Sequence, residues 1–295
     1  MIDKTAVIAI VGRPNVGKST LVNALAGEKV AIVTNKPQTT RTRIRAVVNR
    51  DATQMVFIDT PGFHKARTRL GDYMVRLSRE SVSEVDAAVL VVEPIANIGP
   101  QERGLIQRIR ESGVNSVLAI NKIDTVAKEA LLEVIALYAA EHEFDAIVPL
   151  SAKKGDGLEL LLGELEKFAV EGAQLFPDGM ITDQPEAQVC AELVREKLLI
   201  CLDSEVPHGI AVEVTKFSER DNEIIDLEVT IYCEKASHKG IIIGKDGAML
   251  KKIGEMARRE IEAYMGTKVF LQTWVKVREN WRDKQASLRN FGFND

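Results

Sequence analysis

The sequence predicts two domains of different class: an α/β domain with a mostly parallel sheet and helices on both faces, then a smaller α+β domain. The first half alternates short apolar runs with helical patterns, as βαβ units require. A polar stretch with two prolines and a glycine follows at 173–185, and the order of elements changes beyond it. A chain of 295 residues is long enough for two separate cores. We therefore assign 1–172 to the first domain, 173–185 to a linker and 186–295 to the second.

In the first domain, the runs expected to be strands are largely apolar, which suits strands covered on both faces. They are Ala6–Val11, Arg45–Asn49, Met55–Asp59, Ala87–Glu93, Ser116–Asn121 and Ala146–Leu150. Helical spacing of apolar residues predicts the helices, at Lys18–Ala26, Leu70–Ser83, Gln101–Ser112, Lys128–Glu141 and Gly157–Ala169.

In the second domain, the expected order is helix, strand, strand, helix, helix, strand. The ranges are Glu186–Leu202, Ile210–Phe217, Ile225–Cys233, a short helix around Ser237–Ile243, Ala248–Met265 and Lys268–Val277. A charged tail that contains aromatic residues follows.

Composition limits the class of protein. Hydrophobic residues make up 45% and charged residues 28%, and no apolar stretch approaches the roughly 20 residues that span a bilayer. The N-terminus lacks the pattern of a cleavable secretion signal and runs directly into a strand. The cysteines (Cys190, Cys201 and Cys233) are odd in number and have no CxxC spacing, which argues against a disulfide framework or a zinc site. A reducing cytoplasm fits best.

Charge is distributed unevenly along the chain. Residues 173–234 hold 4 basic and 14 acidic side chains, whereas residues 235–295 hold 13 basic and 7 acidic. A polyanion would be drawn to the last stretch. If charge were the only observation, solvated helix faces would be the better explanation.

The segment GRPNVGKS at 12–19 lies between a strand and a helix, the context that a phosphate-binding loop requires. Its glycines let backbone N–H groups close around phosphates, and the helix N-terminus adds partial positive charge. We expect Lys18 to reach the β- and γ-phosphates and Ser19 to ligate Mg²⁺. The residues assigned to the nucleotide here are Gly12, Arg13, Pro14, Asn15, Val16, Gly17, Lys18, Ser19 and Thr20.

Two further segments are expected to sense the γ-phosphate. In DTPG at 59–62, Asp59 ends an apolar strand and would hold Mg²⁺ through water, while Gly62 offers its N–H to the phosphate. The nucleotide contacts assigned here are Asp59, Thr60, Pro61, Gly62 and Phe63. The polar segment Thr34–Arg43 has the character of a switch loop, with Thr40 expected on the metal and Thr39 as the alternative. The metal set is thus Ser19, Thr40 and Asp59.

The segment NKID at 121–124 is predicted to select guanine. Asp124 presents an acceptor-only carboxylate to the paired N1–H and N2–H₂ donors of guanine, and adenine would leave that charge desolvated and unpaired. Asn121 would tie this loop to the phosphate loop, and the stem of Lys122 would lie along the base. Backbone amides near Ser151, Ala152 and Lys153 would receive guanine O6. GTP or GDP is therefore the expected nucleotide.

The expected catalytic set is Lys18, Thr40, Gly62 and Asn15. Phe63 stands where many GTPases carry a glutamine that orients the attacking water, so we expect slow intrinsic hydrolysis, on the order of 10⁻³ s⁻¹ or below. In related GTPases without the glutamine, an asparagine at the place of Asn15 helps hold a potassium ion, which makes potassium dependence a hypothesis here. His64 is interpreted as a solvated loop histidine.

In the second domain, Gly244-Lys245-Asp246-Gly247 is a GxxG loop between two helices. The motif alone is weak, and a helix with a basic outer face is the alternative. In the predicted order of elements it matches a KH domain of the second topology, whose loop clamps about four single-stranded nucleotides. The RNA contacts assigned are Gly244, Lys245, Asp246, Gly247, Lys251 and Lys252. Trp274 and Trp281 are candidates for stacking on bases, although we expect Trp274 to pack within its strand.

The combination of QTTR at 38–41, DTPGFH at 59–64 and IIIGKDG before the last long helix resembles the bacterial Era family over nearly the whole chain. The resemblance implies a cytoplasmic GTPase, partly peripheral on the cytoplasmic face of the cell membrane. It also implies binding to the 3′ end of small-subunit (16S) ribosomal RNA during maturation of the small ribosomal subunit. We expect a monomer.

Two functional classes stay open. In one, GTP gates RNA binding; in the other, the chain is an RNA-binding checkpoint protein whose nucleotide site is not coupled to RNA. A GTPase of transfer-RNA modification is disfavoured, because it would need a long helical domain and a C-terminal cysteine, and this sequence ends FGFND. The two classes differ in coupling, the difference in RNA affinity between nucleotide states.

Overall fold

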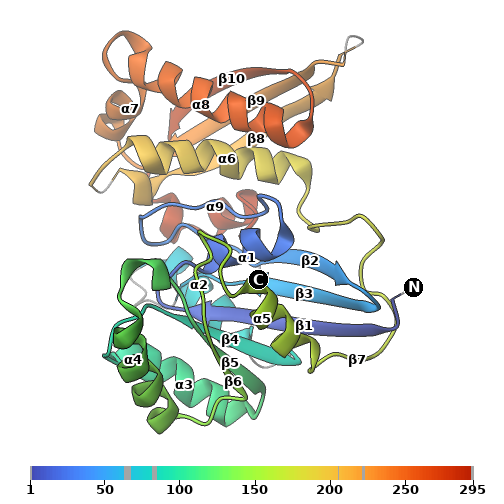
Figure 1. The fold of residues 1–295 in the computed structure, drawn as a ribbon. Helices are drawn as coiled ribbons and strands as arrows, with labels where there is room; N and C mark the ends of the chain where they lie inside the picture. The colour runs from blue at the N-terminus through green and yellow to red at the C-terminus, as the bar shows by residue number, and fades with distance from the viewer. Residues whose placement is uncertain (1, 63–67, 82–84, 205, 221–222, 294–295) are drawn as a thin grey trace. The chain divides into compact units, whose positions relative to one another are not determined.

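The computed structural model describes residues 2–293 except 63–67, 82–84, 205 and 221–222. They form two compact units (Figure 1). The first unit comprises Met1–Ala31, Thr40–Ala66 and Met74–Asp183, and the second comprises Ile32–Thr39, Arg67–Tyr73 and Gln184–Asp295. Two short segments of the first half thus group with the second unit. A division of the sequence into contiguous ranges, such as 1–172, cannot represent this grouping, because the grouping arises from tertiary contacts.

Within the described residues, the first unit is built on a seven-stranded sheet in the order β2-β3-β1-β4-β5-β6, with β7 paired to β1. The strands are β1 (Lys4–Gly12), β2 (Ile44–Arg50), β3 (Thr53–Asp59), β4 (Ala87–Val92), β5 (Asn115–Ile120), β6 (Ala146–Pro149) and β7 (Val170–Glu171). All pairs are parallel except β2 with β3 and β7 with β1. The mostly parallel sheet is as predicted. The short β7 was not predicted.

Helices cover both faces of this sheet because successive strand residues point to opposite sides. On one face, Ile8 and Ile10 of β1 share a core with α1 and α5, and on the other Ala9 and Val11 share a core with α3 and α4. The helices of this part of the chain are α1 (Lys18–Ala26), α2 (Arg69–Glu80), α3 (Pro100–Ser112), α4 (Lys128–Glu141) and α5 (Leu158–Glu166).

The predicted linker lies along the first unit as far as Asp183. Gln54 of β3 is fully buried, and its side-chain oxygen accepts hydrogen bonds from the backbone N–H groups of Leu175 and Phe176, each at 2.9 Å. Farther on, the backbone N–H of Val47 in β2 donates to the carbonyl of Ile181 at 2.8 Å. Leu175, Phe176 and Ile181 therefore make tertiary contacts in addition to their connecting role.

The second unit contains a three-stranded sheet, counted over the described residues, in the order β10-β9-β8 (Figure 1). Its strands are β8 (Ala211–Glu219), β9 (Ile225–Cys233) and β10 (Val269–Val277), and its helices are α6 (Glu186–Cys201), α7 (Ala236–Ile243), α8 (Ala248–Met265) and α9 (Gln285–Asn290). β10 pairs with β9 in parallel and β8 pairs with β9 in antiparallel. α6 packs on α8 and β8, and α8 also packs on β10. The predicted α–β–β–α–α–β order is confirmed.

The C-terminal segment differs from the predicted charged tail. Trp281 is fully buried, its indole N–H donates to the carbonyl of Gly209 at 2.9 Å, and its ring meets the Phe291 ring edge-on at 5.2 Å between centroids. Stacking of Trp281 on bases is therefore excluded. The expectation for Trp274 was also wrong, because its side chain on β10 is 54% exposed. In the described part of the chain, no helix is both long and apolar enough to cross a membrane.

Candidate nucleotide site and GxxG groove

The residues assigned to the nucleotide gather at one edge of the parallel sheet, where such folds bind ligands. The phosphate loop follows β1, Asp59 ends β3, Asn121 follows β5, and Ser151 comes two residues after β6. Phe63 and His64 lie outside the described residues.

The phosphate loop closes tightly before α1. Gly17 has φ +101°, a left-handed conformation that favours glycine, and a Cβ there would overlap the side-chain amide nitrogen of Asn121. Gly62 approaches the loop from the other side, because a Cβ on Gly62 would lie 2.9 Å from the backbone nitrogen of Pro14. Both glycines thus permit close contacts that a side chain would prevent. The first turn of α1 leaves backbone N–H groups facing the loop.

Lys18 places a cation inside this loop. It is 6% exposed, and its ammonium group donates to the carbonyls of Gly12 at 3.2 Å and Arg13 at 3.0 Å. Burial lowers the pKa of Lys18, and the negative charge of Asp59 partly offsets that effect. A charge kept in a dehydrated loop interacts strongly with a bound phosphate.

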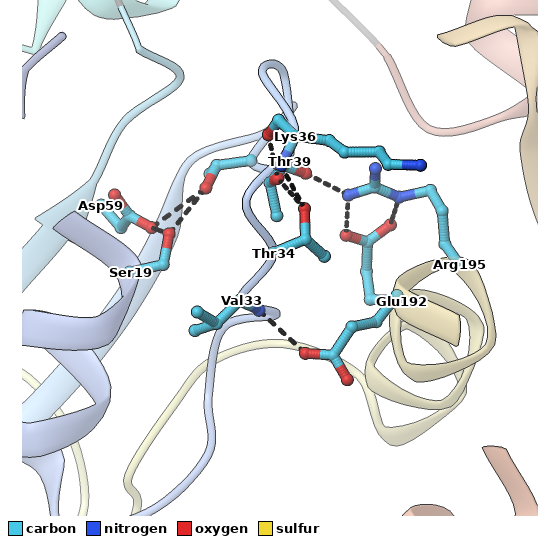
Figure 2. Close-up of polar contacts among 10 residues, drawn as sticks. Ser19, Val33, Thr34, Lys36, Thr39, Asp59, Glu192 and Arg195 are labelled. Carbon is cyan, nitrogen blue, oxygen red and sulfur yellow. Dashed lines mark hydrogen bonds and ion pairs between the residues drawn. The ribbon is translucent and has the colours of Figure 1, made fainter. Parts of the chain in front are cut away.

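Three oxygen-bearing side chains converge below the loop (Figure 2). The Ser19 hydroxyl donates to Asp59 Oδ2 at 2.6 Å, the Thr40 hydroxyl donates to the same oxygen at 3.2 Å, and the two hydroxyls lie 2.8 Å apart. Burial raises the pKa of Asp59, while Lys18 and the two hydroxyl hydrogen bonds oppose the rise. Asp59 Oδ1 is buried and has no hydrogen-bond partner within the described residues. Hydroxyl and carboxylate oxygens with one unused lone-pair site fit a hard cation such as Mg²⁺.

The structure distinguishes Thr40 from Thr39, the alternative left open by the sequence. The Thr39 hydroxyl is used locally, where it lies 2.7 Å from the Thr34 hydroxyl and donates to the Lys36 carbonyl at 2.7 Å. Only Thr40 of this pair contacts Ser19 and Asp59 in the hydrogen bonds described. The sequence prediction that favoured Thr40 agrees with this geometry.

The side chain of Asn121 forms hydrogen bonds with the phosphate loop and with the loop that follows β6. The contact with the phosphate loop was predicted from the sequence. Its side-chain nitrogen donates to the Val16 carbonyl at 2.9 Å, and its oxygen accepts from the Ala152 N–H at 3.0 Å. The Lys122 ammonium donates to the Asn15 carbonyl at 2.7 Å. The loop between β5 and α4 is thereby fixed to the phosphate loop.

Asp124 is oriented by Ser151, whose hydroxyl donates to Asp124 Oδ1 at 2.6 Å. This hydrogen bond is the main reason that the pKa of Asp124 lies below its ordinary value. The side chain therefore stays an ionised, acceptor-only group, which suits two parallel N–H donors.

Two acidic residues that support the phosphate loop were missed by sequence reasoning. Glu93 pairs with Lys122 at 2.5 Å and with Arg13 at 3.6 Å, and the buried Glu102 also pairs with Arg13. Glu93 follows β4 directly, at the same sheet edge as the other site residues, and this position was the available signal. Their carboxylates fix the two basic side chains that flank the loop.

The GxxG loop joins α7 to α8. Gly244 has φ +73°, and a Cβ there would lie 2.7 Å from the Cβ of Met249, so glycine is required at this close approach. Asp246 is also left-handed at φ +52°, and Gly247 caps α8 at φ +79°. Lys245 is exposed at the tip. The loop thus presents the side chain of Lys245 to solvent.

A groove of about 520 Å³ starts at this loop and runs between α8 and β10. Of the predicted RNA residues, Gly247 and Lys251 line it, and Lys252 is not part of its lining. Arg258 and Phe270 also line it and were not predicted. Arg258 lies seven residues after Lys251, on the same helix face, and that spacing was the missed signal. The groove thus combines cations with an aromatic ring that is 46% exposed.

Comparison with known proteins identifies two domains in the chain. Residues 7–122 match the family described as 50S ribosome-binding GTPase, and residues 205–282 match the KH domain family. GTPase Era of Ruminiclostridium cellulolyticum is 49% identical over 290 residues, covering 98% of this chain and 97% of that protein. GTPase Era of Clostridioides difficile is 49% identical over 294 residues, covering 99% of each.

Two solved Era structures superimpose on nearly the whole chain, each with a TM-score of 0.95 and 37% identity, covering 99% of this chain and 100% of the other. One is a variant of Aquifex aeolicus Era bound to GDP·AlF4⁻. The other is Era in complex with MgGDPNP and nucleotides 1506–1542 of 16S ribosomal RNA. Full-length identity near one half, shared domain composition and shared fold lead to one conclusion: the chain belongs to the Era family of GTPases.

Proposed function

We propose that this GTPase binds the 3′ end of small-subunit ribosomal RNA through its KH domain and assists assembly of the small ribosomal subunit. The observation that carries the proposal is the groove between α8 and β10, where Lys251 and Arg258 line the same cavity as Phe270. Proteins bind single-stranded nucleic acid with cations that contact its phosphates and with exposed aromatic rings that stack on its bases. The Era complex with 16S nucleotides supports this choice of RNA.

In the nucleotide site, the proposed roles follow from the geometry. Lys18 and the N–H groups that open α1 neutralise the phosphates, and Asp124 accepts from the guanine edge. Ser19, Thr40 and Asp59 would hold Mg²⁺, which supplies positive charge to the β- and γ-phosphate oxygens. The N–H of Gly62 would meet the γ-phosphate, because this glycine already packs against Pro14 of the loop.

RNA would enter the groove at the GxxG end. Gly244 and Gly247 keep the backbone accessible, while Lys245, Lys251 and Arg258 are exposed cations for the phosphates. Phe270 and Trp274 are four residues apart on β10, so both lie on the same side of the strand, and both are exposed. Bases would stack on these rings.

The test is the affinity of the full chain for an oligonucleotide of the 16S 3′ end, measured with GDPNP and with GDP. We expect tight binding, and Lys251→Ala should weaken it and lower the slope of log K against log salt by about 0.7, the value for one phosphate contact with a single strand. The matched control is Lys216→Ala, which removes an exposed cation on β8 that pairs with Asp226 of β9. This variant should leave binding unchanged. Absence of binding in both nucleotide states would refute the RNA assignment.

The same titration separates the two functional classes. A tenfold preference for one nucleotide state corresponds to about 1.4 kcal/mol of coupling and would establish a switch that acts on RNA. Equal, tight binding in both states would favour the checkpoint protein with an uncoupled nucleotide site.

We also propose that hydrolysis depends on potassium. Asn15 is exposed in the phosphate loop at φ +67°, and the sequence predicts a contact between this residue and a monovalent cation beside the phosphates. Turnover should be several-fold faster in potassium chloride than in sodium chloride at equal ionic strength. Asn15→Ala should abolish the difference between the salts. Equal turnover of the unaltered chain in both salts would contradict the proposal.

Cytoplasmic location is proposed on the basis of three free cysteines, of which Cys190 and Cys233 are buried. Burial raises the pKa of the Cys190 thiol to about 12, so this group is inert toward oxidation. Contact with the membrane face and a monomeric state stay predictions from the sequence.

A further inference from the structure

The segment Ile32–Thr39, which includes the first part of the predicted switch loop Thr34–Arg43, groups with the second unit, although in sequence it lies between α1 and β2 of the first. Its first residue, Ile32, is 3% exposed and belongs to the apolar cluster that includes Val189 and Leu193 of α6. A loop that is expected to respond to the γ-phosphate is thus held by the core of the other unit. The question is what this attachment does to the nucleotide site.

Helix α6 and the residues after it hold the segment by polar contacts along its length (Figure 2). The backbone N–H of Val33 donates to Glu196 Oε1 at 2.9 Å, and the Lys36 ammonium reaches the Leu202 carbonyl at the end of α6 and Asp203. At the far end, the guanidinium of Arg195 donates to the Thr39 carbonyl. Thr39 directly precedes Thr40, a residue of the nucleotide site, in the sequence.

Arg195 is itself rigidly held. It is 2% exposed, and its Nε and one terminal nitrogen donate to the two oxygens of Glu192 at 2.7 and 2.5 Å. A bidentate pair of this kind fixes the plane of the guanidinium. The donor that reaches Thr39 therefore has a set position and direction.

The segment from Thr34 to Thr39 also contains hydrogen bonds among its own residues. The Thr34 hydroxyl accepts from the Lys36 N–H at 3.1 Å and lies 2.7 Å from the Thr39 hydroxyl, which in turn donates to the Lys36 carbonyl. Thr34, Lys36 and Thr39 are thus tied to one another, and an anchor at Lys36 restrains Thr39 as well.

The Thr39 carbonyl belongs to the peptide group that leads into Thr40. Because a peptide group is planar, fixing its oxygen also fixes the direction in which the Thr40 Cα leaves the group. Thr40 is 7% exposed, and its hydroxyl contacts Ser19 and Asp59. A single peptide plane therefore links the guanidinium of Arg195 to the metal-binding oxygens.

We propose that Arg195 is a positioning residue for GTP hydrolysis: it holds the Thr39 carbonyl and so presents the Thr40 hydroxyl to the magnesium site. The proposal rests on the GTPase activity of the family and is independent of RNA binding. GDP has no γ-phosphate for the Thr40 loop to enclose, so loss of Arg195 should impair the GTP state far more than the GDP state.

The experiment compares Arg195→Ala with the unaltered full chain over a range of Mg²⁺ concentrations. We expect kcat to fall at least tenfold and the Mg²⁺ concentration for half-maximal activity to rise several-fold, with GDP affinity unchanged within twofold. Arg195→Lys should restore part of the activity, because an ammonium can reach the carbonyl but cannot form the bidentate pair with Glu192. Gln188→Ala, an exposed change on the same helix, is the control and should match the unaltered chain.

If Arg195→Ala does not fold, Glu192→Gln keeps the arginine and removes only the charge that orients it, and a smaller loss of kcat with the same Mg²⁺ shift is expected. Unchanged kcat and Mg²⁺ dependence in either folded variant would overturn the proposal. An equal loss of GDP and GTP affinity would also overturn it, since that pattern indicates a general structural role.

Discussion

Replacing Lys18 with alanine is expected to abolish GTP turnover, with kcat/KM reduced about a thousandfold or more. The ammonium is buried inside the phosphate loop, held by the carbonyls of Gly12 and Arg13. The γ-phosphate gains charge on its equatorial oxygens during transfer, and a positive charge in a dehydrated loop stabilises that charge strongly. Single-turnover hydrolysis and equilibrium binding of GDP and GDPNP measure the effect.

Lys18 also neutralises a buried carboxylate, so its removal needs a structural control. Without it, Asp59 would keep a buried charge that is stabilised by hydrogen bonds from Ser19, Thr40 and the Thr60 backbone but by no cation, and the thermal midpoint should fall. Lys18→Met with a measured unfolding curve separates loss of chemistry from loss of fold, and Lys128→Ala, an exposed change on α4, is the charge-matched control. A folded Lys18 variant that turns over GTP within tenfold of the unaltered chain would refute the assignment.

The second large effect is expected at Asp124, where asparagine should change the base that the site accepts. The neutral amide loses the two charge-assisted acceptors for guanine N1–H and N2–H₂, and guanine affinity should fall by about a hundredfold or more. Xanthine carries a carbonyl in place of the exocyclic amine, so the amide of asparagine can donate to it. Xanthosine triphosphate should therefore bind the Asp124→Asn variant better than GTP.

Competition between GTP and xanthosine triphosphate for a fluorescent nucleotide measures the change. The unaltered chain should prefer GTP at any pH above the pKa of Asp124, which the Ser151 hydrogen bond holds below its ordinary value. Because the pKa is lowered, the carboxylate contribution is present above that range and is lost only as the pH falls through it. A variant that still prefers GTP would show that Asp124 does not read the base.

The features predicted correctly from sequence are the local ones. Apolar runs marked the strands of the first unit, and a motif that directly follows a strand has its position set by that strand, which is why Lys18, Asp59 and Asn121 meet at one sheet edge. The Thr39 to Arg195 contact had no such signal, because 156 residues separate the partners and only tertiary packing joins them.

Surface roles in the second unit were also harder to predict. Trp274 and Trp281 are of the same type and only seven residues apart, yet one is exposed on β10 and the other is fully buried beneath the C-terminal segment. Burial of Trp281 depends on Gly209 and Phe291, which lie far from each other in sequence. Residue type alone does not tell which of the two tryptophans is buried, because burial depends on how the surrounding chain packs.

The attachment of residues 181–183 to β2 bears on the exposed edge of the sheet. β2 is the outermost strand of the sheet, and an open edge offers unpaired N–H and C=O groups to any other strand. Ile181 takes up the N–H of Val47, and Asp183 places a carboxylate 2.6 Å from Arg45. A segment that connects two units thus also covers part of this edge, and a first domain cut at 172 would expose it to pairing with other strands.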